Sequence, residues 1–155
     1  MKQTKILGLF TAVYICCMLL GGCGAADNST DEFVQMVNPL ATVSSVQEME
    51  AQLGYSVPVL DKEVESYIVL VIDGSAESGR IRYTDGSDFN IKRGSGDISG
   101  IYGGAMERQS SINGVPVSFW VYGSTHYALW EKDGFTYSLA GTAVSEEDLS
   151  ALLEK

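Results

Sequence analysis

The chain has few of the residue types on which much protein chemistry depends. Its 155 residues hold one histidine, three cysteines and 10 basic side chains against 20 acidic ones, a formal net charge of -10. A phosphate backbone is bound chiefly by Lys and Arg, so this acidic balance excludes nucleic acid as an expected partner. With one histidine and one cysteine after position 17, the usual nitrogen and sulfur ligands of zinc cannot be assembled. We therefore expect no zinc site, and nothing in the sequence indicates another cofactor.

The scarcity of histidine also limits catalysis. Any Ser-His-Asp arrangement would have to use His126, and no G-x-S-x-G nucleophile elbow occurs. A histidine without an oriented partner rarely acts as a base, so we expect His126 to be a surface or packed residue. Nothing singles out two of the 20 acidic residues as a glycosidase pair. Calcium binding by Asp85, Asp88 or Asp97 stays open, although no spacing resembles an EF-hand. No catalytic residue is expected.

The N-terminus carries a targeting signal. Lys2 and Lys5 precede an apolar run over residues 6–20, which makes a charged region followed by a hydrophobic region of signal-peptide length. The sequence Leu20-Gly21-Gly22-Cys23 resembles the lipobox of bacterial lipoproteins, which implies a diacylglycerol on Cys23 and cleavage before it. A transmembrane anchor is the alternative, but a span needs about 20 apolar residues and this run stops sooner. We predict a lipoprotein signal peptide over residues 1–22.

This prediction decides where the mature chain lies. Cys16 and Cys17 leave with the signal peptide, so neither an intramolecular disulfide nor a free thiol remains. Residues 23–32 form the acylated cysteine and a flexible tether, which reaches at most about 30 Å. Residues 33–155 form one extracytoplasmic domain. Loss of Lys2 and Lys5 leaves a charge balance of -12, which an anionic membrane surface repels. We expect a protein anchored by lipid on the outer side of the cell membrane.

The apolar pattern of the mature chain predicts an α+β domain. One helix is expected near residues 44–54, capped by Ser44 or Ser45 and ended by Gly54, and a second follows Ser145 to the end of the chain. Between them the apolar period is two, with glycine-containing turns. Residues 64–73 are apolar on both faces, so we expect both faces to be covered. The remaining strands are predicted at 80–84, 88–93, 101–112, 115–122, 125–131 and 135–140. The whole is an antiparallel β-meander of about six or seven strands with an N-terminal and a C-terminal helix.

The pleat of the strands predicts how the last hairpins are joined. A two-residue turn at Asp133-Gly134 would pair apolar with polar residues on both faces of the sheet, so a three-residue loop is predicted over residues 132–134. The same argument gives a three-residue loop over residues 123–125. These loops place one apolar set on the core face: Val117, Phe119, Val121, Tyr127, Leu129, Phe135, Tyr137 and Leu139.

Two other turns are predicted from the same rule. A two-residue turn fits Asn113-Gly114, because apolar residues then meet on either side of it. At Asp85-Gly86 an odd-length loop is predicted, which places Ile81 opposite Phe89 or Ile91.

The face opposite the predicted core is the candidate binding surface. Parity places Trp120, Tyr122, His126 and Trp130 together there, with the small residues Ala128, Thr136, Ser138 and Ala140 between the rings. Two interpretations stay open. A helix or an N-terminal segment covers this face, since large aromatic side chains usually pack, or the face is an aromatic platform for a peptide, glycan or protein partner. Burial of both tryptophan rings would exclude the platform.

The glycine-rich segment Gly94–Gly100 is not a nucleotide site. Its last glycine lies one residue late for G-x-G-x-x-G, and no amphipathic helix is predicted after it. We expect a glycine-rich turn with a bulge, and no nucleotide partner.

Several short segments resemble a known family. They are Ile91-Lys92-Arg93, Gly96–Gly100 followed by Tyr102, Asn113-Gly114-Val115, Ala128-Leu129-Trp130, Gly134–Ser138 and Ser145-Glu146-Glu147. On these residues, residues 38–153 resemble a family of small uncharacterised lipoproteins of clostridia-type Gram-positive bacteria, whose domain is also similar to the extracytoplasmic part of some anti-sigma-factor-like membrane proteins. The resemblance implies a curved antiparallel sheet outside the cell and implies no enzymatic residues.

Two functions from different classes follow. The expected one is a lipid-anchored, non-enzymatic binding or interaction module at the cell envelope, and the alternative is a small cell-wall-active hydrolase. A hydrolase needs a buried carboxylate or histidine with a shifted pKa in a cleft, whereas a binding module needs only an exposed apolar surface. Apart from the membrane itself, an envelope protein, a peptide or a glycan is the expected partner.

Overall fold

The computed structural model describes residues 38–154. The predicted signal peptide over residues 1–22, Cys23 and the tether over residues 23–32 lie outside the described residues, as do residues 33–37. Residues 37–155 form one compact unit. All residues of its apolar core cluster fall between Val43 and Leu153. The domain thus supplies a hydrophobic core of its own, and we treat it as a unit that folds without the residues before it.

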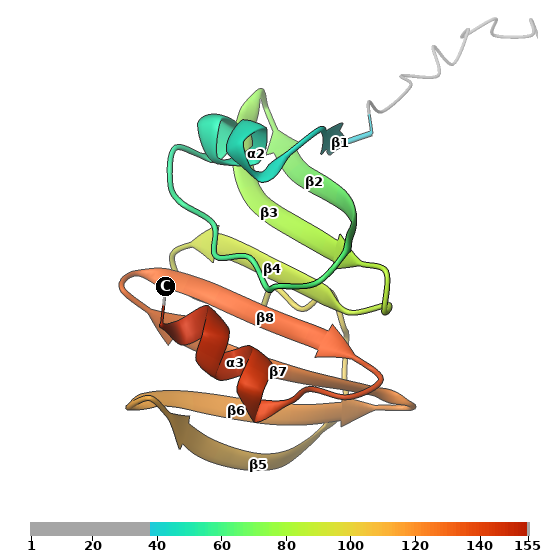
Figure 1. Ribbon diagram of the computed structural model, residues 1–155, viewed down its shortest axis with the longest axis vertical. Helices are drawn as coiled ribbons and strands as arrows, with labels where there is room; N and C mark the ends of the chain where they lie inside the picture. The colour runs from blue at the N-terminus through green and yellow to red at the C-terminus, as the bar shows by residue number, and fades with distance from the viewer. Residues whose placement is uncertain (1–37, 155) are drawn as a thin grey trace, which may run out of the picture. The chain divides into compact units, whose positions relative to one another are not determined.

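Eight antiparallel strands form a single sheet (Figure 1). The α+β class predicted from the sequence is confirmed, with eight strands in place of six or seven. In chain order the strands are β1 (Leu40–Val43), β2 (Val64–Ile72), β3 (Ser75–Tyr83), β4 (Asp88–Arg93), β5 (Ala105–Ile112), β6 (Val115–Tyr122), β7 (Thr125–Lys132) and β8 (Phe135–Gly141).

The sheet consists of two meanders rather than the single predicted one. Its strand order is β1-β2-β3-β4-β8-β7-β6-β5. Strands β1 to β4 form the first meander and β5 to β8 the second. Strands β4 and β8 meet at the centre, with Asp88 opposite Ala140 and Arg93 opposite Phe135. The chain leaves β4 along residues 94–104 and begins β5 at the far edge of the sheet. A run of hairpins predicts that consecutive strands are neighbours, and the long glycine-rich connection is the point where that rule fails.

Strand β1 and the first half of β3 were not expected from the sequence. Strand β1 is a four-residue edge strand, too short to show an alternating pattern, and it pairs only with β2. The first residues of β3, Ser75 to Gly79, include no β-branched or aromatic side chain, so the usual signal of a strand is absent. Pairing with the apolar strand β2 places them in the sheet.

Two helices form where the capping residues predict them. Helix α2 (Val46–Leu53) begins at Ser45, whose hydroxyl accepts from the Glu48 N–H, and ends at Gly54 with a left-handed φ of 73°. Helix α3 (Glu146–Leu153) begins at Ser145, whose hydroxyl accepts from the Asp148 N–H. Both helices lie on the same face of the sheet (Figure 1). We call it the helix face, and the side of the sheet away from the helices is the loop face.

The helix face carries the hydrophobic core. Met49 and Leu53 of α2 approach Gly79 of β3 closely, and Leu149, Leu152 and Leu153 of α3 are buried in the same cluster. The sheet contributes Val69, Ile81, Phe89, Ile91, Val117, Phe119, Ala128, Trp130 and Leu139.

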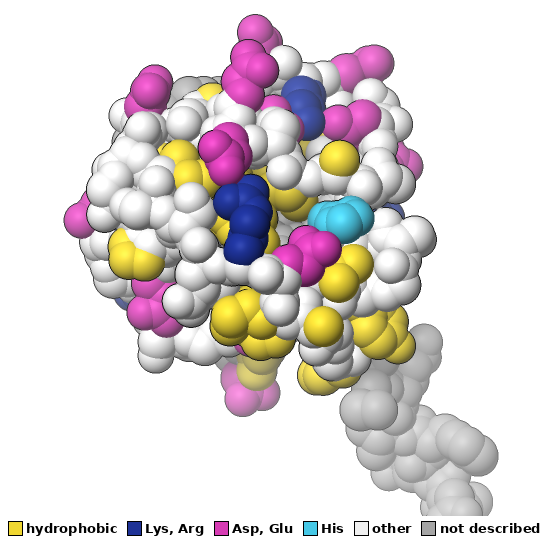
Figure 2. All heavy atoms as spheres, turned by 90° about the horizontal axis from the view of Figure 1, so that it is seen from below, with side chains coloured by type: hydrophobic (Ala, Val, Ile, Leu, Met, Phe, Trp, Pro, Cys, Tyr) yellow, Lys and Arg dark blue, Asp and Glu magenta, His cyan; other side chains and the backbone are white. Residues whose placement is uncertain are grey.

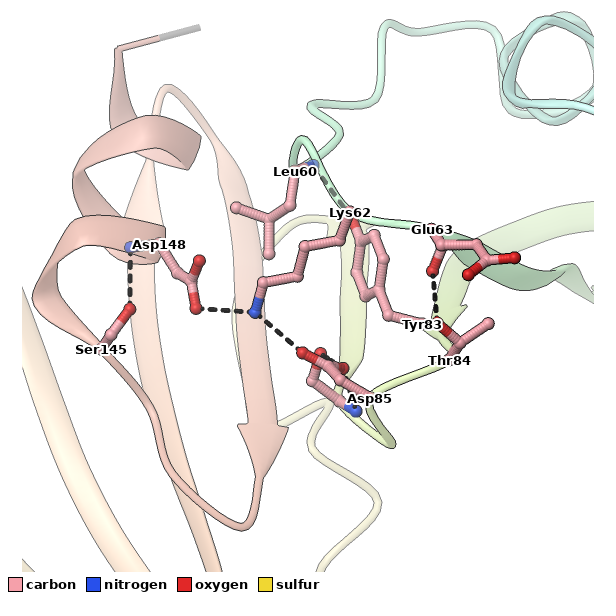
Figure 3. A network of polar contacts seen from close by, with 9 residues as sticks. Leu60, Lys62, Glu63, Tyr83, Thr84, Asp85, Ser145 and Asp148 are labelled. Carbon is pink, nitrogen blue, oxygen red and sulfur yellow. Dashed lines mark hydrogen bonds and ion pairs between the residues drawn. The ribbon is translucent and has the colours of Figure 1, made fainter.

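The connection between α2 and β2 crosses the helix face and is fixed by polar contacts. The Leu60 N–H donates to the Tyr83 hydroxyl over 3.0 Å. Lys62 Nζ donates to Asp148 of α3 over 2.8 Å and to Asp85 of the β3–β4 hairpin over 3.0 Å, as Figure 3 shows. Burial opposes the charge of Lys62, but the two carboxylates outweigh it and raise its pKa. One side chain thus joins three segments that lie far apart in the sequence.

The hairpin registers confirm two predictions and overturn two. The turn at Asn113-Gly114 is a two-residue turn. The loop at Asp85-Gly86 is odd, since Ile81 lies opposite Phe89. The three-residue loops predicted over 123–125 and 132–134 are wrong, because Tyr122 lies opposite Thr125 and Lys132 opposite Phe135, so both turns have two residues.

Candidate functional site

The four aromatic residues predicted to share one face are not brought together. A one-residue change of register moves every side chain of a strand to the other face of the sheet. Both turns that flank β7 have two residues in place of the predicted three, so β7 is reversed relative to the prediction while β6 and β8 keep their predicted faces. Trp120 and Tyr122 stay on the loop face, in line with Tyr127 and Leu129. His126 and Trp130 lie on the other side of the sheet. The predicted platform of Trp120, Tyr122, His126 and Trp130 is therefore wrong as a single surface.

Trp130 is a core residue. Its side chain is 3% exposed, and its ring stacks on Tyr137 with centroids 5.4 Å apart. Trp120 stacks on Tyr127, with centroids 6.2 Å apart. The two-residue turn at Asp133-Gly134 thus pairs Trp130 with Tyr137, and this pairing of an apolar with a more polar side chain is an aromatic stack against the core.

His126 lies near the edge of the sheet beside an acidic side chain. Its Nδ1 is 3.5 Å from the Glu107 carboxylate, and Figure 2 shows the single histidine next to an acidic residue on this surface. The side chains of both residues are 42% exposed, so water reaches the pair. An exposed contact of this kind contributes little to stability and gives no sign of a catalytic base.

The loop face is covered in its middle by the glycine-rich connection, residues 94–104. Thr136 Oγ1 donates to the Gly94 carbonyl over 2.6 Å, and the Tyr127 hydroxyl donates to the Gly103 carbonyl over 2.9 Å. Beneath the connection, Asn90 and Ser138 are buried and joined by a hydrogen bond of 3.1 Å. Of the two interpretations left open for this face, a cover by a helix or an N-terminal segment and an aromatic platform, neither describes its middle, where within residues 38–154 the cover is this connection.

Glycine is required where the connection returns to the sheet. Gly104 has a φ of +109°, and a Cβ on it would lie 2.8 Å from the Val121 carbonyl oxygen and 3.0 Å from the Tyr127 hydroxyl. Gly94, Gly96 and Gly100, which superficially resemble a phosphate-binding loop, have positive φ values of 91°, 100° and 70° and serve the turns of the connection. The connection leads directly into β5, so no helix N-terminus is available for a phosphate.

A groove lies between this connection and the first meander, and it is the candidate functional site. It encloses about 640 Å³, which is within the size range of small-molecule sites. One wall is aliphatic and comes from β1 and β2, the other is polar and comes from β3 and β4, and the connection closes the third side. The lining includes Leu40, Ile68, Leu70, Ile72, Ser78, Arg80, Asn90, Lys92, Ile98, Ile101 and Tyr102.

The aliphatic wall corrects a further expectation. Residues 64–73 were predicted to be covered on both faces, but only the side of β2 that carries Val69 is packed in the core. Ile72 is 49% exposed and Leu40 of β1 is 47% exposed. Large aliphatic side chains at the rim of a hollow are common where a ligand or partner binds.

The register of the first meander sets the geometry of the groove. One row across the strands runs from Leu40 through Leu70 and Ser78 to Lys92. Ile68 lies opposite Arg80, which lies opposite Asn90, in the next row. Each row therefore passes from an aliphatic to a basic or polar side chain within a few strand spacings.

The groove was not predicted from the sequence, although the correctly predicted loop at Asp85-Gly86 already places two of its polar residues on one face. The odd loop at Asp85-Gly86 places Arg80 opposite Asn90 and leaves Lys92 on the same face. What the sequence did not show is that β2 joins this face with its second apolar side uncovered, because that depends on where the connection over 94–104 lies.

The three aspartates that were considered for calcium binding each accept from a neighbouring donor. Asp85 accepts from the Ser87 hydroxyl over 2.6 Å, Asp88 from Arg82 over 3.0 Å, and Asp97 from the Ser99 N–H over 2.7 Å. Within residues 38–154, no group of three or more His, Cys, Asp or Glu side chains is arranged to hold a metal ion. In the same residues, no helix is long and apolar enough to cross a membrane.

No family model, curated protein or solved structure matches the chain. The groove and the sequence signals are therefore the observations that bear on function, and the resemblance to small Gram-positive lipoproteins stays a prediction.

Proposed function

We propose that the chain is a lipid-anchored binding module of the cell envelope, held outside the cytoplasmic membrane by the lipid on Cys23. The module binds an envelope component in its groove and does not transform it chemically. The observation that supports this most directly is the groove itself, an open hollow with exposed aliphatic side chains on one wall and ordered polar groups on the other. Sites for small ligands combine these two kinds of lining.

The titratable groups favour binding over the alternative of a small hydrolase. A glycosidase needs a carboxylic acid that keeps its proton near neutral pH, hence a raised pKa. Among the described carboxyl groups with a shifted pKa, Glu48 has it lowered by hydrogen bonds from Ser44, and Asp85 has it lowered to about 2 by Ser87 and then Lys62. Both therefore stay ionised and act as structural acceptors.

A retention experiment tests the groove. Residues 38–155 are immobilised and exposed separately to a lipid extract, to envelope proteins and to wall fragments. We expect one of these fractions to be retained by the wild type and lost by the double variant Leu40→Glu/Ile72→Glu, because two carboxylates would make the aliphatic wall polar. Met106→Glu is the matched control, since Met106 of β5 is 48% exposed and does not line the groove. Retention of no fraction, or equal retention by the double variant, would refute the proposal.

The lipid anchor gives a separate prediction. Cys23 is the only cysteine left after the predicted cleavage, so Cys23→Ala should release the protein from membranes. Fractionation of cells that make the full chain, with mass spectrometry of the product, measures this. A Cys23→Ala variant that stays membrane-bound at its uncleaved mass would show a transmembrane anchor instead.

A further inference from the structure

We propose that the ligand of the groove is an amphipathic anion, an aliphatic chain that ends in a carboxylate or phosphate group. This inference rests on the proposed function, because it names the chemical class of what the groove binds.

Two cationic side chains that line the groove, Arg80 and Lys92, have no carboxylate partner within the described residues. In the described residues, Lys62, Arg82 and Arg108 each pair with a carboxylate. Arg80 instead donates to the neutral Asn90 side chain over 2.7 Å, and no ion pair within residues 38–154 involves Arg80 or Lys92. In a chain with twice as many acidic as basic residues, two cations that face one hollow without a carboxylate partner leave it ready for an anion.

The other charged residues that line the groove do not cancel this charge. Arg93 stacks over Tyr55, at 5.6 Å from the ring centroid, so its guanidinium lies on the helix face. The Glu77 carboxylate lies close enough to Tyr55 to act on the pKa of its hydroxyl, which is also on the helix face. Asp97 also lines the groove, and its carboxylate accepts from the Ser99 N–H. Arg80 and Lys92 also line the groove, and neither Glu77 nor Asp97 lies within ion-pair distance of these two cations.

The aliphatic wall of the groove lies beside these cations. Ile68 lies on the strand next to Arg80, and Leu70 and Leu40 follow in the row that ends at Lys92. With strands about 4.8 Å apart, the three spacings from β1 to β4 give a path of roughly 14 Å. A medium-length alkyl chain fits this path, with its apolar part on β1 and β2 and its anionic end between β3 and β4. A wholly polar anion would leave the aliphatic wall in water, and a neutral lipid would leave both cations unpaired.

Titration calorimetry on residues 38–155 tests the inference with four probes that share one chain, each kept below its micelle concentration: dodecanoate, dodecyl phosphate, dodecanol and dodecyltrimethylammonium. We expect at least one anion to bind about tenfold or more tightly than dodecanol, and the cation not to bind. The preferred anion then indicates whether a fatty acid or a phosphate-bearing lipid is the source. In Arg80→Gln/Lys92→Gln, the preference for the anion over dodecanol should disappear.

Arg82→Gln is the matched control. It removes a cation from the same strand and face as Arg80, but one already paired with Asp88, so the preference for the anion should remain. Equal affinity for dodecanol and the anions, a preference that survives in Arg80→Gln/Lys92→Gln, or no binding of any probe would overturn the inference. If the retention experiment nevertheless shows another fraction that depends on Leu40 and Ile72, the proposed function stands and only the ligand class is wrong.

Discussion

At the scale of single residues, Asp85 shows how a short loop fixes a charge. Its carboxylate accepts from the Ser87 hydroxyl over 2.6 Å and from the Ser87 N–H over 2.9 Å, and it also meets Lys62. These contacts lower the pKa of Asp85 to about 2 from an ordinary 3.8, and the hydrogen bond from the Ser87 hydroxyl has the largest effect. The ionised form is therefore the one that the folded hairpin stabilises.

The pH dependence of stability follows from that shift. A carboxyl group whose pKa is lowered by folding stabilises the fold above its unfolded pKa, here 3.8, and loses this contribution as the pH falls to about 2. We expect Ser87→Ala to be less stable than the wild type at neutral pH, and the difference to shrink between pH 3.8 and about 2. Because the Asp85 side chain is 49% exposed, solvent screening keeps this pH-dependent part below about 1 kcal/mol.

Urea unfolding at a series of pH values measures the difference. Ser95→Ala, in the exposed part of the connection, is the control and should follow the wild-type curve at every pH. A difference for Ser87→Ala that is the same at neutral and acidic pH would mean that the serine acts through packing and not through the Asp85 charge.

At the scale of elements, the sheet depends on two-residue turns with a common chemistry. Asp73, Asn113 and Asp133 have φ values of 50°, 51° and 52°, and the glycines after them also have positive φ. Two successive residues with positive φ make a type I′ turn, whose twist matches that of the strands. Asp and Asn tolerate the first position and glycine takes the second without a steric penalty.

Gly134→Ala tests this chemistry at the β7–β8 hairpin. Gly134 has a φ of 80° and open space where a Cβ would lie, so the cost is conformational and should be about 1–2 kcal/mol of unfolding free energy. Chemical denaturation measures it. Asp133→Gly is the control, because glycine accepts the same φ, and it should cost less than Gly134→Ala. Equal stability of Gly134→Ala and the wild type would argue against a type I′ turn.

The same hairpin explains what the sequence could and could not predict. Helix caps at Ser45 and Ser145 and the turn at Asn113-Gly114 depend on local chemistry and were predicted correctly. The prediction of a three-residue loop at Asp133 was wrong because it depends on all the apolar residues of the last strands sharing one face of the sheet. In the structure both faces of β7 carry buried side chains, Trp130 in the core and Tyr127, which is 2% exposed, on the loop face. Alternation therefore carried no information about its register, and turn chemistry was the better guide.

The prediction of the binding surface was wrong for a different reason. The aromatic residues were grouped by the alternation of side chains along the strands. An error in the register of β7 therefore placed Trp130 on the face of Trp120, whereas the two residues lie on opposite faces. The groove depends on a long-range feature, the path of residues 94–104 over the sheet, which no local pattern encodes. Only the pairing of Arg80 with Asn90 was within reach of the sequence.

At the scale of the whole molecule, the two meanders are joined along a central seam. Strand β4 pairs with β8 over its whole length, and a single core cluster includes Met49 of α2 and Leu153 of α3. The Lys62 contacts add a link between the β3–β4 hairpin and α3. A continuous core with paired central strands predicts that the halves unfold together.

Met49→Ala tests this cooperativity, because the two tryptophans both lie in the second meander, on β6 and β7, whereas Met49 is fully buried against the first. The cavity should lower the unfolding free energy by about 2–5 kcal/mol. If the domain is one unit, the midpoint detected by tryptophan fluorescence falls together with the midpoint detected by far-ultraviolet circular dichroism. Met49→Leu, which nearly conserves volume, should cost less than about 1.5 kcal/mol. A fluorescence midpoint that stays at its wild-type value while the circular dichroism midpoint falls would show that the meanders unfold separately, and the groove, built on the first meander and the connection, could then open without disturbing the second.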